Sequence, residues 1–180
     1  MRTLLVLLAV LVPLTLGASI SNAEGHARSA FGFNASLSGF PTGSARLTGG
    51  GSYDPASASN TIGDETTVKS SGGFRCTSDV GQGPLSGCLE GEGVRWDTVQ
   101  LLASTTFKCN GAADTAHTVT TDNDTIVILA DFYRAGDGID ESFGNVPMFV
   151  SDQDERPDLP GDQNVWIAGV GCGDGVVNFN

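Results

Sequence analysis

Apolar and polar residues alternate along most of the chain, which predicts β-strands and argues against long helices. The strongest strand covers 125–134, and because both of its faces are largely apolar, we expect it to be central in its sheet. Similar alternation predicts further strands over 31–37, 45–53, 68–76, 116–121, 146–150, 165–170 and 176–179, with another beginning at 107. The second and third of these are expected to pair as a hairpin with a long loop. Pro147 has no N–H to donate, so its strand is expected at a sheet edge.

One segment departs from strict alternation. Asp97 and Gln100 stand at the spacing of a helix-capping box, with Gln at the third helical position. Apolar residues recur beside them at helical spacing, at Trp96, Val99, Leu102 and Ala103. The pattern predicts a single helix over 97–104, although the two threonines that follow favour a strand and keep the β alternative open. With about seven to nine strands, the expected fold class is mainly β, an antiparallel β-sandwich or small β-barrel with one short helix.

Residues 1–23 have the three parts of a secretory signal peptide. A basic residue precedes an apolar run over 4–16, and Ser21-Asn22-Ala23 offers small residues at a cleavage site, with a cut after Ala18 as the second choice. The apolar run is shorter than the roughly 20 residues that span a bilayer. We therefore expect 24–180 to be a single disulfide-bonded β domain, secreted to the extracellular space or periplasm without a stable membrane anchor.

All four cysteines lie beyond the signal segment, at Cys76, Cys88, Cys109 and Cys172. An oxidising compartment favours two disulfides, and four cysteines allow three connectivities. We expect the nearest-neighbour pairing, because Cys88 lies in a glycine-rich segment that begins just after Cys76. The second bond, Cys109–Cys172, would then tie the C-terminal strand to the middle of the chain. Zinc is disfavoured because there is no C-x-x-C spacing, and the even count leaves no thiol for catalysis.

The composition narrows the classes of partner. The chain has 21 acidic and 9 basic residues, a formal net charge of −12. Nucleic-acid binding needs Lys and Arg to replace phosphate counterions, so this charge argues against it. The same charge disfavours attraction to anionic membrane surfaces. The expected partner is therefore an unidentified ligand or protein, and not a nucleic acid.

Templates for catalysis are missing. The expected mature chain has no G-x-S-x-G, no H-E-x-x-H, no P-loop and no dinucleotide-binding glycine motif after a strand. Its only histidines are His26, close to the new N-terminus, and His117, in a polar stretch beside threonines where a solvated side chain is the simpler interpretation. We therefore assign no catalytic residue, and an enzyme is the less favoured class.

Paired carboxylates are the one enzymatic idea that the composition permits. Glycoside hydrolysis needs two of them, one with a raised pKa beside an apolar wall. Asp131 is the best candidate because it interrupts an apolar face of the 125–134 strand. The simpler interpretation is that Asp131 is solvated or pairs with Arg134 or Arg95.

Two acidic loops have the oxygen ligands that calcium prefers. They contain Asp137, Asp140 and Glu141 in one case, and Asp152, Asp154, Glu155 and Asp158 in the other. Neither matches the EF-hand pattern, and solvated loops are the simpler interpretation in an acidic protein. We assign no metal and no cofactor site.

Arg95 and Trp96 stand together in a glycine-containing segment over 91–97. Exposed Arg and Trp are frequent binding anchors. The favoured interpretation is that Trp96 packs beneath the sheet while Arg95 pairs with Asp97.

Four segments resemble a group of small exported bacterial proteins of unassigned function. They are 72–76 (GGFRC), 91–98 (GEGVRWDT), 107–109 (FKC) and 164–173 (NVW followed by GVGCG). The resemblance covers about residues 43–180 and implies a bacterial exported origin. It implies no activity, cofactor or catalytic residue.

These observations favour an exported β-domain with a binding or structural role. One alternative is a barrel that holds a small apolar ligand, with cyclase- or isomerase-type chemistry, which requires an apolar cavity of several hundred Å³ inside a closed sheet. The other is a carboxylate-dependent glycan hydrolase, which requires a second carboxylate about 5–10 Å from Asp131.

Overall fold

The computed structural model of the protein describes residues 28–38, 43–81, 83–109, 114–134 and 142–180. Apart from one 3-10 turn, η1 (Pro55–Ser57), the regular secondary structure in these ranges is β-strand. The strands are β1 (Ser29–Ser38), β2 (Ser44–Tyr53), β3 (Val68–Ser78), β4 (Gly93–Leu102), β5 (Ser104–Phe107), β6 (His117–Thr120), β7 (Thr125–Arg134), β8 (Ser142–Ser151), β9 (Val165–Ile167) and β10 (Gly171–Phe179).

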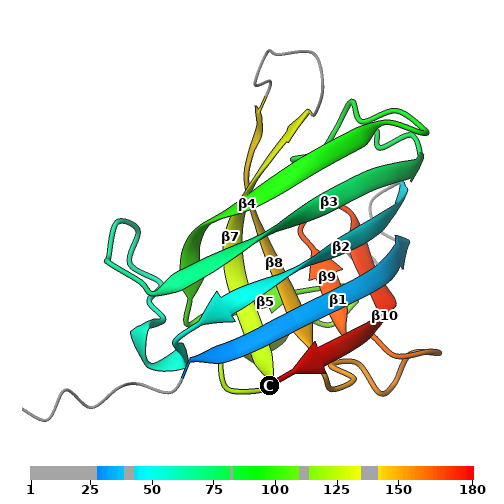
Figure 1. Ribbon diagram of the computed structural model, residues 1–180. Helices are drawn as coiled ribbons and strands as arrows, with labels where there is room; N and C mark the ends of the chain where they lie inside the picture. The colour runs from blue at the N-terminus through cyan, green and yellow to red at the C-terminus, as the bar shows by residue number, and fades with distance from the viewer. Residues whose placement is uncertain (1–27, 39–42, 82, 110–113, 135–141) are drawn as a thin grey trace, which may run out of the picture.

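Eight of the strands form a closed antiparallel barrel in the order β1-β10-β9-β8-β7-β4-β3-β2 (Figure 1). Closure occurs at β1, where Phe33 lies opposite Gly49 of β2 on one side and Val177 of β10 on the other. Strands β5 and β6 form a separate two-stranded sheet. The mainly β fold class is confirmed, and of its two forms the barrel is present. The hairpin expected between β2 and β3 is also confirmed.

The helix predicted over 97–104 is wrong. Its residues, apart from Ala103 between the two strands, belong to β4 and the start of β5, and β4 pairs with both β3 and β7. The pairing of β4 with β7 shifts register between Thr98 and Gln100, so the strand contains a bulge. Because of the extra residue, the inward-facing positions of β4 change from even-numbered ones, such as Trp96, to odd-numbered ones, such as Leu101. This break in alternation gives the apolar residues a spacing that resembles that of a helix.

Inward-facing side chains from all eight strands fill the barrel. The large ones include Phe31, Phe33, Tyr53, Phe74, Trp96 and Phe132, all buried. The indole of Trp96 packs over Gly49 and Gly72, and its Nε1 donates a hydrogen bond to the carbonyl of Thr48 at 3.2 Å. A Cβ atom at Gly72 would collide with the Thr48 carbonyl and lie 2.5 Å from the indole nitrogen. These glycines therefore make room for the largest interior ring.

The two ends of the barrel are closed by different means. At one end the disulfide Cys76–Cys88 holds a loop that inserts Val80 and Leu85 into the core. At the other end the Tyr53 hydroxyl donates to the carbonyls of Asp122 and Thr125, at 2.8 and 3.3 Å. Burial and the nearby Asp122 carboxylate raise the pKa of Tyr53, so its hydroxyl stays a hydrogen-bond donor.

A second apolar cluster lies outside the barrel wall. It packs the β5–β6 sheet against the outer faces of β7, β8 and β9, with Phe107 centred 4.8 Å from Phe149 and 5.9 Å from Trp166. The disulfide Cys109–Cys172 belongs to this cluster, and both disulfides follow the expected pairing. The prediction that 125–134 is central with two apolar faces is confirmed, since β7 lies between β4 and β8.

The edge position expected for Pro147 is wrong, because the closed barrel leaves β8 paired on both sides. Strand β9 pairs with β8 only from Met148 to Val150. Pro147 lies just beyond that stretch, so β9 does not need the N–H that proline lacks.

Candidate functional site

The barrel interior is the first place where a ligand could bind. It is occupied by contacting apolar side chains, among them Ile126, Ile128, Met148 and Val150, each buried to 1% exposure or less. An interior site of several hundred Å³ would require many of these side chains to move. Because the interior is filled with side chains, the outer face of the barrel wall is the better candidate for a ligand-binding site.

A groove of about 630 Å³ runs across the outer face of β1–β4. These strands lie side by side on the near wall in Figure 1. We call it the arginine groove and define it by outward-facing residues of the four strands: Asn34, Arg46, Thr48, Gly73, Arg75, Gly93 and Arg95. Its volume falls within the roughly 300–1,000 Å³ of ordinary small-ligand sites.

Strand register brings the three arginines together. Arg46 of β2 lies directly opposite Arg75 of β3, and Arg95 of β4 lies opposite Gly73, two residues along β3 from Arg75. Direct cross-strand neighbours have Cβ atoms about 4.5–5.5 Å apart, and diagonal neighbours are about 7–8 Å apart. All three side chains are exposed. The guanidinium groups can therefore reach a shared ligand.

These three arginines have no carboxylate partner among the described residues. In contrast, Arg134 pairs with Glu92 at 2.5 Å, and Arg156 pairs with Asp114 at 2.8 Å. Like charges directly opposite each other on paired strands are destabilising. The groove thus gathers three of the nine Lys and Arg residues of a strongly acidic chain at a position where they repel one another.

Sequence reasoning located one of these residues and missed two. Arg95 is exposed as a binding anchor would be, but the expected pairing with Asp97 is wrong, because Asp97 accepts a hydrogen bond from the Tyr133 hydroxyl at 2.7 Å. The expectation that Trp96 packs beneath the sheet is confirmed. Arg46 and Arg75 both lie at outward-facing positions of strands in which polar and apolar residues alternate. That alternation was the signal in the sequence that could have found them.

The candidate carboxylate Asp131 does have a near neighbour. It lies opposite Asp97 across β4 and β7, on the outer face of the wall. Asp131 accepts a hydrogen bond from the Ser142 hydroxyl at 2.5 Å. Both carboxylates are therefore engaged by hydroxyl donors, and Asp97 is exposed to solvent.

The other residues singled out in the sequence do not converge on a site. His117 lies on β6 with its ring 6.0 Å from that of Phe107, and His26 lies outside the described residues. The acidic segment over 137–141 also lies outside them. In the second acidic loop, Asp154 accepts from the backbone N–H groups of Arg156 and Gln163, both at 3.0 Å. Within the described ranges, no group of three or more His, Cys, Asp or Glu side chains could hold a metal ion.

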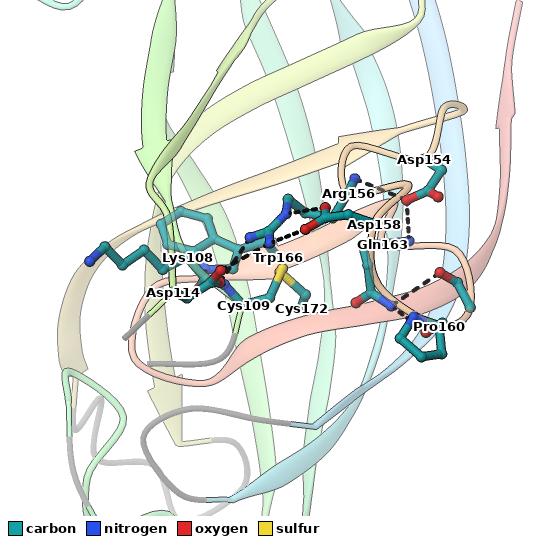
Figure 2. Close-up of a disulfide and its surroundings, with 11 residues drawn as sticks. Lys108, Cys109, Asp114, Asp154, Arg156, Asp158, Pro160, Gln163, Trp166 and Cys172 are labelled. Atoms are coloured by element: carbon teal, nitrogen blue, oxygen red, sulfur yellow. Dashed lines mark hydrogen bonds and ion pairs between the residues drawn. A yellow bond between two sulfur atoms is a disulfide. The ribbon is translucent and has the colours of Figure 1, made fainter. Parts of the chain in front are cut away.

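Arg156 anchors this second acidic loop to the neighbouring chain segment, as Figure 2 shows. Its guanidinium is 2% exposed and binds both oxygens of Asp114, at 2.8 and 2.9 Å. It also binds both oxygens of Asp158, at 2.9 and 3.0 Å. These hydrogen bonds raise the pKa of Arg156 and lower that of Asp158. With four of its five N–H donors engaged in this way, Arg156 holds loops in place and is not free to bind a ligand.

No protein-family profile, curated protein or solved structure matches the chain. No helix in the described part of the chain is long and apolar enough to cross a membrane.

Proposed function

We propose that the protein is an exported β-barrel binding domain that takes an anionic ligand in the arginine groove. The observation that carries the proposal is the placement of Arg46, Arg75 and Arg95 on three adjacent strands, facing one hollow, without a described carboxylate partner. A bound carboxylate, sulfate or phosphate would replace their mutual repulsion with charge-assisted hydrogen bonds.

Export is the second part of the proposal. Two disulfides are compatible with an oxidising extracellular or periplasmic compartment, and residues 1–23 have the pattern of a signal peptide. A rigid, disulfide-bonded barrel suits a binding role there, because strands hold side chains at fixed spacing.

The net charge of −12 does not oppose a ligand at this site. Charges farther away than the Debye length of about 8 Å at physiological ionic strength are largely screened, so nearby groups set the field in the groove. These are the three arginines and Asp97, which stands two residues from Arg95 on the outer face of β4. Acidic residues concentrate elsewhere, for instance at Asp122, Asp124, Asp152 and Glu155.

A carboxylate-dependent glycan hydrolase is the second candidate, and the cross-strand neighbours Asp97 and Asp131 are the observation in its favour. It predicts hydrolysis of a glycan that Asp131→Asn abolishes. If the Asn variant cleaves a broad glycan panel as the unchanged protein does, or if neither cleaves any member, the hydrolase assignment fails.

Citrate and inorganic sulfate are suitable first probes of the arginine groove, titrated at low salt by calorimetry into the disulfide-bonded protein. We expect binding that weakens as sodium chloride is added. Arg75→Gln should weaken citrate binding by roughly tenfold, because Arg75 neighbours both other arginines and hydrogen bonds to charged groups contribute about 1.5–3 kcal/mol.

Lys69→Gln is the matched control, because it removes one exposed cation from the outer face of the same strand, outside the groove. It should leave citrate binding within about twofold, as expected for a screened distant charge. Arg75→Gln should melt no lower than the unchanged protein, since it relieves a like-charge pair. Equal effects of the two variants, or no binding of either anion, would overturn the proposal.

A further inference from the structure

We infer that the natural ligand of the arginine groove is an acidic glycan, whose sugar rings carry carboxylate or sulfate groups and lie flat on the barrel wall. The inference rests on the proposed function and adds the ligand class. It is argued from the floor of the groove, from the neutral groups beside the arginines and from the closure of the sheet.

The floor of the groove is open backbone. Gly73 and Gly93 both face outward there, between the arginine side chains. A Cβ atom at Gly73 would meet only the Thr48 hydroxyl, at 3.6 Å, and one at Gly93 would meet nothing within 4 Å. Neither position needs glycine for packing, in contrast to Gly72, so the missing side chains leave a flat surface where a ring can approach the strands.

Neutral polar groups flank the charges. Asn34 and Thr48 are both exposed and stand directly opposite each other on β1 and β2. An amide and a hydroxyl can each donate and accept hydrogen bonds, which matches the hydroxyl groups of a sugar. A ligand made only of anionic groups would use the arginines and leave this pair without a role.

The groove strands offer no free edge to an extended peptide. Peptides that bind β-sheets commonly add a strand and pair through main-chain hydrogen bonds. Here β1, β2, β3 and β4 are each paired on both sides. A peptide could contact the groove through side chains alone, without that main-chain pairing.

Single-stranded nucleic acids are typically held by bases stacked on aromatic side chains. Phe74 is the one aromatic residue that lines the groove, and it is 3% exposed with its ring packed on Phe132 inside the barrel. The described lining of the groove therefore has anion-binding groups and no exposed aromatic ring. Among charged polymers, this combination favours a glycan.

The test compares four-unit ligands in the disulfide-bonded protein by calorimetry at one salt concentration. The probes are tetragalacturonate, a heparin-derived tetrasaccharide, a neutral galactose tetrasaccharide, a tetraglutamate peptide and a dT tetranucleotide. We expect at least one acidic tetrasaccharide to bind about tenfold or more tightly than the peptide and the tetranucleotide, a difference of about 1.4 kcal/mol. The neutral tetrasaccharide should not bind measurably. Tetragalacturonate against tetraglutamate is the comparison of like charge, and the heparin-derived tetrasaccharide shows whether added sulfate groups strengthen binding.

Gly73→Val separates ring recognition from charge, because it fills the floor and removes no arginine. It should weaken the acidic tetrasaccharide about tenfold more than it weakens citrate, because a sugar ring must reach the strand backbone whereas the small, flexible citrate can bind the ends of the exposed arginine side chains. The fold should tolerate the change, since β-branched residues suit strands and the site has space for a Cβ. Ser71→Val, an outward substitution on the same strand outside the groove lining, is the matched control and should change neither.

The outcomes distinguish the two proposals. If citrate binds and Arg75→Gln weakens it, while the acidic tetrasaccharides bind no better than tetraglutamate or dT, the anion site stands and the glycan assignment is wrong. Equal weakening of citrate and tetrasaccharide by Gly73→Val also overturns the glycan assignment. If no anion binds at all, both proposals fall.

Discussion

The two halves of the barrel wall have the same inner architecture and different outer faces. On β7–β9 the outward side chains include Val127, Phe149 and Trp166, and the β5–β6 sheet covers them. On β1–β4 the outward positions carry mainly Asn, Ser, Thr, Gly and Arg, together with Lys69 and Asp97, and the outer face of these strands lies open along the groove. Closing a barrel buries one face of every strand, so the other face is free to be either packed or functional.

The comparison shows where the polar side chains of the protein are satisfied. On the covered half, Arg156 is buried and bound by two carboxylates. On the open half, β1–β4, Arg46 and Arg75 are exposed and lie opposite each other on paired strands. A buried cation without partners would destabilise the fold strongly, whereas an exposed one without partners costs little and can bind a ligand.

The largest expected effect is on the covered half. Arg156→Met leaves Asp114, 7% exposed, as a buried carboxylate without its cation, and removing one partner of such a pair typically costs about 3–5 kcal/mol. Urea unfolding measures the loss. The double variant with Asp114→Asn should recover part of it, because the buried negative charge is gone. A loss below about 1 kcal/mol in the single variant would mean that the pair behaves like a surface ion pair.

An intermediate effect is expected on β1–β4, where it distinguishes substitutions on the inner face from those on the outer face. Gly72→Ala places a methyl group against the Thr48 carbonyl and the Trp96 indole, and we expect a loss of about 1–3 kcal/mol from overpacking. The methyl group of Gly73→Ala would point into open space. This variant should leave the stability unchanged or raise it by up to about 1 kcal/mol, because alanine reduces the conformational freedom of the unfolded chain. Thermal unfolding of the two variants gives the comparison. Equal melting temperatures would contradict the assignment of inner and outer faces.

The smallest expected effect concerns the acidic groups beyond β7 and β8. Partial desolvation and the negative charges of Asp124 and Asp122 raise the pKa of Asp152, and desolvation raises the pKa of Glu155. A raised carboxyl pKa means that the folded state holds the proton more tightly, so these groups favour folding when protonated and destabilise it as pH rises through their folded pKa values.

Asp152→Asn should therefore raise the melting temperature at pH 7 by roughly 1–2 °C, the size expected for an exposed charge. The difference should vanish at low pH, where the carboxyl is protonated in both states. Asp158 has the opposite sign, because its hydrogen bond with Arg156 lowers its pKa and that stabilisation is lost as pH falls through the lowered value. If Asp152→Asn melts at a lower temperature than the unchanged protein at pH 7, the argument that its charge destabilises the fold is wrong.

Much of the fold follows from local pattern. The alternation around Phe33, Leu47 and Ile128 predicted strands that the structure contains, and these three residues face inward. The pattern failed at the bulge in β4, because a bulge is defined by its partner strand and leaves a helix-like spacing in the chain itself. It also misplaced Pro147, because closure of the sheet cannot be recognised from one strand.

The candidate site was harder to predict from the sequence than the fold. Arg95 drew attention because it stands beside Trp96, whereas Arg46 and Arg75 are separated from it and from each other along the chain. Only the register of β2, β3 and β4 makes them neighbours. The pair Asp97 and Asp131 became neighbours in the same way.

The amino-acid sequence alone determined that this chain forms short alternating strands, that its cysteines favour two bonds and that its overall charge is strongly negative, because these are properties of composition and of residues close together along the chain. Tertiary structure decided that the sheet closes, which outer faces are covered and which cations remain without partners. Those outcomes depend on pairing between strands far apart in sequence, where a shift of one residue would exchange the inner and outer faces and scatter the arginines.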